Sequence, residues 1–190
     1  MQKLAYPTRI ITAAPFMATL LFSLLYLFQP TAFTDLTHYL CSLLFFAVLP
    51  LLAYPVAAIV PALRAKGRPA QRHLAIVFSV VGYLAGLLYL GLAGGTRTEW
   101  MVYLTYAISG VGIALFSFVF HFKASGHACG VSGPVAMLAY CLGAPWLACY
   151  LLLALVFWAS LKMRRHTVAQ LAVGSLIPVM AIVMLAQLLP

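Results

Sequence analysis

The stretch LAIVFSVVGYLAGLLYLGLA, residues 74–93, is an unbroken apolar run of 20 residues. A helix of about 20 apolar residues spans the ~30 Å hydrocarbon core of a bilayer. Gly94-Gly95 ends the run, and a basic segment, residues 61–73, precedes it. We therefore predict that residues 74–93 cross a membrane as a helix.

The rest of the chain has the same character. Of its 190 residues, 65% are hydrophobic and only 7% are charged, too few charges to cover the surface of a soluble domain. The run at residues 10–28 is too long for a signal peptide and no small-x-small cleavage site follows it, so we expect a retained helix. No segment outside the runs is long enough to fold alone, which predicts a single integral membrane domain, residues 1–190. The expected membrane helices are residues 10–28, 38–60, 74–93, 100–120, 128–143, 146–161 and 167–188.

The predicted fold is thus an all-α, polytopic transmembrane helical bundle. Two of the predicted helices, residues 128–143 and 146–161, are short, so we expect six to seven membrane helices. The four cysteines lie in apolar segments without the spacing of metal ligands, so we predict neither a disulfide framework nor a zinc site.

Seven alternating crossings place nearly all the cations on one face. The breaks at residues 61–73, 121–127 and 162–166 fall together with the N-terminus, whereas both acids fall on the opposite face. Orientation alone can produce this pattern, because basic loops stay cytoplasmic. The alternative is an anionic ligand, such as a phosphate, bound by cations from several loops. The cations on this face are Lys3, Arg9, Arg64, Lys66, Arg68, Arg72, Lys123, Lys162, Arg164 and Arg165, ten of the 11 in the chain.

Two histidines on the same face can carry chemistry. Ser125-Gly126-His127 stands at the expected start of a helix, where free backbone amides favour an anion. A histidine there can donate a proton to a leaving oxygen. His166 begins the last helix, where its imidazole can attack phosphorus. Gln170, four residues on, lies on the same helix face and can orient His166 through a ring nitrogen.

Lys123-Ala-Ser-Gly-His127, followed one helical hairpin later by Arg165-His166-Thr167 with Gln170 and Gly174, resembles the type-2 phosphatidic-acid phosphatase superfamily. The signature of these lipid phosphate phosphatases has three parts: Lys with a later Arg-Pro, then Pro-Ser-Gly-His, then Ser-Arg-x5-His-x3-Asp. The resemblance covers about residues 61–175, and Arg68-Pro69 matches the end of the first part. The resemblance implies a lipid-phosphate-phosphatase-like core.

This chain departs from the signature at five positions. Pro61 stands where the first lysine is expected, and Ala124 stands in place of proline. Ala159 and Ser160 stand where the Ser-Arg of the third part is expected, and Gln170 replaces its aspartate. Two phosphate clamps are missing, and clamps of this kind are a large catalytic term.

The resemblance implies a metal-independent phosphatase without a cofactor. His166 would attack the phosphate, His127 would protonate the leaving lipid oxygen, and water would hydrolyse the phosphohistidine. Expected substrates are lipid phosphate monoesters or diphosphates: phosphatidate, phosphatidylglycerol phosphate or a polyprenyl diphosphate. The expected catalytic residues are His166, His127 and Gln170, and the expected substrate-binding residues are Ser125, Gly126, Lys123, Arg68, Arg64, Lys66, Arg164 and Arg165.

Two other classes of protein remain as alternatives. The first is a catalytically impaired protein that binds or carries a lipid phosphate. An unrelated transporter fits less well, because transporters place polar residues mid-membrane and these runs contain almost no charge. We expect the bilayer and a lipid with a phosphate headgroup as partners, no nucleic acid, and residence in a bacterial inner (plasma) membrane. The sequence carries no signal for an oligomeric state.

Overall fold

The computed structural model describes residues 7–8 and 10–189, apart from the side chains of Arg68, Pro69 and Arg72. Lys3 and Arg9, two of the predicted cations, lie outside the described residues. Helix accounts for 84% of the chain and no strand occurs in the described part, so the predicted all-α fold is confirmed. The elements are α2 (Ala14–Phe28), α3 (Leu36–Leu43), the π-helical turn η1 (Leu44–Val48), α4 (Leu49–Ile59), α5 (Pro61–Ala65), α6 (Gly67–Ala93), α7 (Arg97–Phe118), α8 (Gly126–Leu142), the 3₁₀ turn η2 (Ala144–Cys149), α9 (Tyr150–Lys162) and α10 (Val168–Leu188).

Five helical segments of the described chain are long and apolar enough to cross a membrane. Much of their apolar surface is not covered by protein: Leu92 is 81% exposed, and Ile59 and Phe118 are each 77% exposed. The acyl chains of a bilayer cover such surface without an unfavourable contact with water. The chain is therefore an integral, multi-pass membrane protein. The five segments are Leu36–Ile59, His73–Ala93, Arg97–Phe118, Ala144–Lys162 and Val168–Leu188.

Two further helices, α2 and α8, are shorter and lie inside the bundle. They contain 15 and 17 residues, which correspond to lengths of ~22 and ~26 Å at 1.5 Å per residue. Both bury one side closely, with Phe22 of α2 and Val131 of α8 fully inaccessible. Length alone therefore supports five spanning helices, and the predicted six to seven includes these two inner ones.

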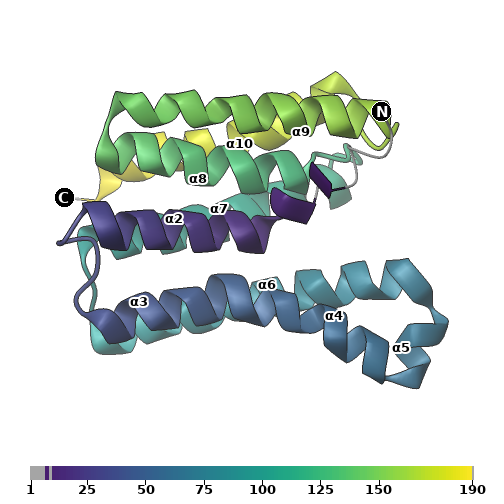
Figure 1. Ribbon diagram of the computed structural model, residues 1–190, viewed down its shortest axis with the longest axis horizontal. Helices are drawn as coiled ribbons and strands as arrows, with labels where there is room; N and C mark the ends of the chain where they lie inside the picture. The colour runs from purple at the N-terminus through teal and green to yellow at the C-terminus, as the bar shows by residue number, and fades with distance from the viewer. Residues whose placement is uncertain (1–6, 9, 190) are drawn as a thin grey trace.

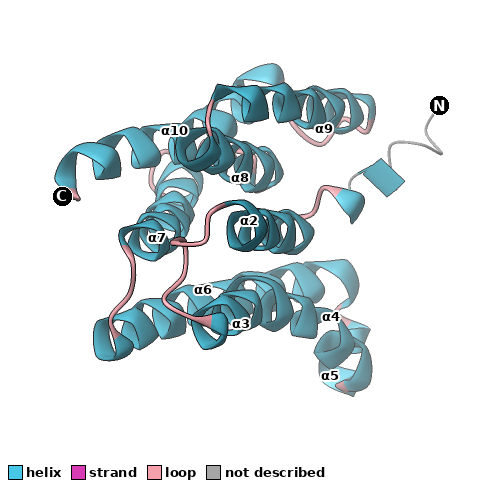
Figure 2. Ribbon diagram, turned by 60° about the vertical axis from the view of Figure 1, so that its left-hand side comes forward, coloured by secondary structure: helices cyan, strands magenta, loops and turns pink. Residues whose placement is uncertain are grey.

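The helices form three layers, which Figures 1 and 2 show from two directions. One layer contains α3, α4 and α6, the middle layer contains α2 and α7, and the third contains α8, α9 and α10. Phe22 of α2 joins the first two layers, because its ring lies 5.4 Å from that of Phe46 in η1, between α3 and α4. α8 joins the second and third layers, since it packs against both α2 and α10.

Successive segments run in alternating directions, as the crossings predicted. α5 and the loops 119–125 and 163–167 lie at one end, which we call the basic end (Figure 1). The linker 29–35, the turn 94–96 and the C-terminus lie at the opposite end. α8 and α10 both begin at the basic end and run side by side, so their N-termini share it.

The polar break at residues 61–73 is helical instead of forming a long loop. α5 occupies Pro61–Ala65, and α6 begins at Gly67, several residues before the apolar run. Gly67 has φ +63°, a left-handed conformation that glycine adopts without steric cost and that separates the two helices. Pro69 falls in the first turn of α6, where no backbone donor is needed.

The second predicted helix contains a π-helical turn that its hydropathy did not predict. η1 lies between α3 and α4, and Pro50, the second residue of α4, cannot donate a helical hydrogen bond. Gly82 of α6 crosses here, and a Cβ at this position would collide with the Phe45 carbonyl oxygen. A second proline, Pro55, lies further along inside α4.

The end opposite the basic end contains a buried carboxylate. Glu99 is 1% exposed, and its Oε1 lies 2.7 Å from His38 Nδ1. Its Oε2 accepts hydrogen bonds from Thr34 Oγ1 at 3.1 Å and from the Thr96 backbone N–H at 2.7 Å. The sequence predicted Glu99 on the face opposite the cations, and the structure uses it there to join the linker after α2, α3 and the start of α7.

Candidate functional site

The two histidine segments of the sequence meet at the basic end. The backbone N–H of Ser125 donates to the carbonyl oxygen of Gln170 at 2.9 Å. At Gly174, one turn further along α10, an added Cβ would lie 2.9 Å from the Ser125 nitrogen, 3.0 Å from its carbonyl carbon and still closer to its oxygen. The loop before α8 is thus seated directly on the first turns of α10. This contact fixes the starts of the two helices relative to each other.

The start of α8 is defined by Ser125. Its side chain caps the helix by accepting from the Ala128 backbone N–H at 3.2 Å, and the residue is fully buried. Serine is among the best N-caps because its oxygen replaces a missing helical acceptor. The Ser125 hydroxyl is therefore engaged in the cap, while Gly126 and Lys123 on either side are exposed.

The start of α10 holds His166 in a defined orientation. Thr167 and Gln170 form a capping box: Gln170 N donates to Thr167 Oγ1 at 3.3 Å, and Thr167 N donates to Gln170 Oε1 at 3.1 Å. The same Oε1 lies 3.3 Å from His166 Nδ1. An amide oxygen can only accept, so Nδ1 must carry the proton. The lone pair of His166 is then on Nε2.

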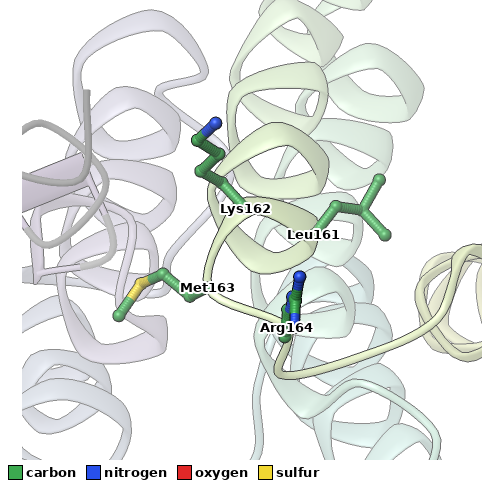
Figure 3. Close-up of a pocket in the computed structure, with 4 residues that line it drawn as sticks. All are labelled: Leu161, Lys162, Met163 and Arg164. Atoms are coloured by element: carbon green, nitrogen blue, oxygen red, sulfur yellow. The ribbon is translucent and has the colours of Figure 1, made fainter.

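A shallow pocket of about 330 Å³ lies beside His166. A second pocket of about 520 Å³ adjoins it at the end of α9 and shares Leu161 and Arg164 (Figure 3). Figure 3 shows that Lys162 and Leu161 project from α9 in different directions. The larger pocket is an open surface hollow. The residues lining the smaller pocket are Leu161, Arg164, Arg165, His166, Thr167 and Gln170.

The turn between α9 and α10 presents the two arginines of the pocket. Arg164 adopts φ +51°, and the Arg165 backbone N–H donates to the Ser160 carbonyl oxygen at 3.0 Å. Both arginine side chains are exposed, whereas Ser160 is completely buried. Ser160, at the position where the family that this sequence resembles has an arginine, therefore points into the bundle. The cations beside His166 come from the turn instead.

His127 makes a contact that the sequence did not predict. Its Nε2 lies 2.9 Å from Thr12 Oγ1, just before α2. His127 is not among the residues that line the pocket beside His166. Nothing in the sequence marks Thr12, because it lies far from both histidine segments and belongs to no motif. Only the packing of α2 on α8 brings it to His127.

The predicted cations of residues 61–73 lie apart from this pocket. Arg64 and Lys66 are exposed, and the helix α5 packs against α4 and α6. Figures 1 and 2 both place α5 at the basic end but in the layer farthest from α9. The side chain of Arg68 lies outside the described residues. The structure thus brings the segments of His127 and His166 into contact, and it leaves α5 on the side of the bundle away from them.

The described residues contain no group of three His, Cys, Asp or Glu side chains that could hold a metal ion. The four cysteines are free thiols, each partly exposed. Comparison of the chain with protein-family models, with curated proteins and with solved structures finds no match. Any function must therefore be argued from the geometry of the site.

Replacing Gly174 by alanine is expected to destabilise the protein and displace the loop before α8. The new methyl group would meet the backbone of Ser125, which cannot move aside as a flexible side chain can. Overpacking of this kind costs about 1–3 kcal/mol. Gly91→Ala in α6 is the matched control, since a Cβ there meets nothing within 4 Å. Thermal unfolding in detergent should show a lower midpoint for Gly174→Ala alone; equal midpoints would contradict the close contact.

Proposed function

We propose that this protein is a metal-independent lipid phosphatase that resembles the type-2 phosphatidic-acid phosphatases. It would hydrolyse a phosphate monoester or diphosphate of a membrane lipid through a phosphohistidine. One observation carries the proposal: the Ser125–Gln170 backbone bond and the Gly174 contact hold the segments of His127 and His166 together. Two segments that resemble parts of one catalytic signature are thereby neighbours at the end of a membrane bundle.

Each residue then has a defined task in the reaction. Nε2 of His166 attacks phosphorus, and the bond from phosphorus to the lipid oxygen breaks as the new N–P bond forms. His127 gives its proton to the departing lipid oxygen. Water next attacks the phosphorus and gives a proton back to His127, the N–P bond breaks, and inorganic phosphate leaves. Arg164 and Arg165 line the pocket beside His166, where their charges offset that of the phosphate.

The membrane setting fits a lipid substrate. The pocket lies at the end of helices that span the bilayer, so a lipid can remain embedded while its headgroup enters. As part of this proposal, α2 and α8 count as membrane helices, which gives seven crossings in one domain with a lipid-phosphate-phosphatase-like core. The same proposal places the protein in a bacterial plasma membrane.

A second function, lipid-phosphate binding without hydrolysis, is supported by specific residues. Gln170 is neutral, so it orients His166 but does not stabilise an imidazolium as a carboxylate does. Ser160 is buried and supplies no cation, and Pro61 begins α5, which packs on α4 and α6. A site with these substitutions can retain a phosphate and turn it over slowly or not at all.

Phosphate release by the purified full chain in detergent tests the proposal. The assay uses phosphatidate, phosphatidylglycerol phosphate and a polyprenyl diphosphate, each labelled in the terminal phosphate. We expect released phosphate, and after rapid denaturation a phosphoprotein that is labile to acid and stable to base, as a phosphohistidine is. Binding of a labelled lipid without release of phosphate and without a phosphoprotein would contradict the phosphatase proposal and support lipid-phosphate binding without hydrolysis.

Gln170→Glu is expected to raise turnover by about tenfold or more. Glutamate preserves the capping box, because it accepts from the backbone at this position as glutamine does. Its charge favours the cationic form of His166 that arises during transfer, the contribution of the orienting carboxylate in other histidine-based hydrolases. Gln170→Ala should instead lower turnover, since His166 loses its Nδ1 acceptor. Rates equal to wild type in both variants would exclude Gln170 as the residue that orients the nucleophile.

A further inference from the structure

We propose that Thr12 is a positioning residue for His127, which it fixes as the Nε2–H tautomer so that Nδ1 delivers the catalytic proton. This inference rests on the proposed function for the identity of the reaction, and on the structure for the contact. Thr12 is 3% exposed, and its Oγ1 has two polar neighbours. They are the carbonyl oxygen of Thr8 at 2.7 Å and Nε2 of His127 at 2.9 Å.

The direction of these hydrogen bonds follows from the number of protons. A threonine hydroxyl has one proton to donate, and the Thr8 carbonyl can only accept it. Oγ1 of Thr12 is then an acceptor toward His127, so Nε2 must carry a hydrogen. Nε2 keeps that hydrogen in both charge states of the ring. The proton that His127 gains and loses is therefore the one on Nδ1.

Packing holds the two residues at this separation. Ala14, two residues after Thr12, packs on Gly130, one turn after His127; a Cβ on Gly130 would lie 2.8 Å from the Ala14 Cβ. α2 and α8 thus approach closely beside the hydrogen bond. Because the start of α8 is also seated on α10 through Ser125, Thr12 contributes to the same site as His166.

The two histidines are consequently held in opposite tautomers. Gln170 requires a proton on Nδ1 of His166 and leaves Nε2 as its reactive nitrogen. Thr12 requires a proton on Nε2 of His127 and leaves Nδ1 as its reactive nitrogen. One neutral oxygen beside each ring determines which atom meets the substrate.

Nitrogen NMR of the full chain in detergent, labelled with ¹⁵N-histidine, tests the tautomer without any substrate. The His127 signals are assigned by their loss in His127→Gln. At a pH where the ring is neutral, we expect the Nε2–H form in wild type and in Thr12→Ser, and a mixture in Thr12→Val. Thr19→Val is the matched control, since the Thr19 hydroxyl bonds in the same way to the carbonyl of Pro15 at 3.0 Å. An Nδ1–H form in wild type, or an unchanged tautomer in Thr12→Val, would overturn the proposal.

Turnover supplies a separate readout that also depends on the phosphatase. Thr12→Val should lower kcat by about tenfold with little change in KM, because general-acid catalysis contributes about 10²–10⁴-fold and is weakened, not removed. Thr12→Ser should restore the rate. If the protein does not hydrolyse lipid phosphates, there is no kcat to compare, but the tautomer measured by NMR is unaffected. A wild-type kcat in Thr12→Val, with lipid turnover established, would contradict the positioning role.

Discussion

Replacing His166 by alanine is expected to abolish lipid phosphate hydrolysis, lowering kcat by at least about four orders of magnitude. In hydrolases that form a covalent intermediate, removal of the nucleophile costs this much or more. The lone pair on Nε2 is set by the Gln170 oxygen that holds Nδ1, so truncation of the ring removes the proposed nucleophile. The phosphoprotein trapped after rapid denaturation should disappear together with the released phosphate.

The fold should survive this substitution. Thr167 and Gln170 keep the capping box of α10 after His166 is truncated, so the unfolding midpoint should change by no more than about 3 °C, which corresponds to about 1 kcal/mol. His73→Ala is the matched control, since His73 is an exposed histidine of the basic end on the opposite layer. Hydrolysis that persists in His166→Ala would exclude the phosphohistidine mechanism.

Local sequence patterns predicted the features that depend on residues close together in the chain: the positions of the helices and the contact of His166 with Gln170. Hydropathy located the helices from residue 74 onward because long apolar runs have no other stable arrangement in a bilayer. The four-residue spacing of His166 and Gln170 predicted a hydrogen bond that the structure contains. Helix starts were less predictable: α6 begins at Gly67 because polar residues continue a helix as well as apolar ones.

Contacts between distant segments were beyond sequence reasoning. The Ser125–Gln170 bond, the Thr12–His127 bond and the burial of Glu99 each join residues from different helices or loops. Glu99 lies shortly after Gly94-Gly95, and nothing near it in the sequence identifies His38 as its partner. The reverse holds for Arg64 and Lys66, which share an end with the histidines but lie on another layer. The alternating crossings determine at which end of the bundle a residue lies, whereas helix packing determines which residues are its neighbours at that end.

Glu99→Ala is expected to cause the largest loss of stability among these substitutions, about 3–5 kcal/mol. Its carboxylate is the acceptor for the Thr34 hydroxyl and the Thr96 backbone N–H, and it lies 2.7 Å from His38 Nδ1. Removing a buried carboxylate that several polar groups share costs this much because those groups stay buried without their acceptor. The linker after α2 and the start of α7 should separate, and the unfolding midpoint in detergent should fall by roughly 10 °C or more.

The other acid of the chain provides the control that separates charge from burial. Asp35 is exposed and caps α3 by accepting from the His38 backbone N–H at 2.9 Å. Asn caps helices about as well, so Asp35→Asn removes one negative charge from the same end at a cost of a few tenths of a kcal/mol. Because Glu99 lies far from the basic end, phosphate release by the fraction of Glu99→Ala that remains folded should equal that of wild type. Equal stability of Glu99→Ala and Asp35→Asn would mean that the buried network contributes nothing beyond the charge.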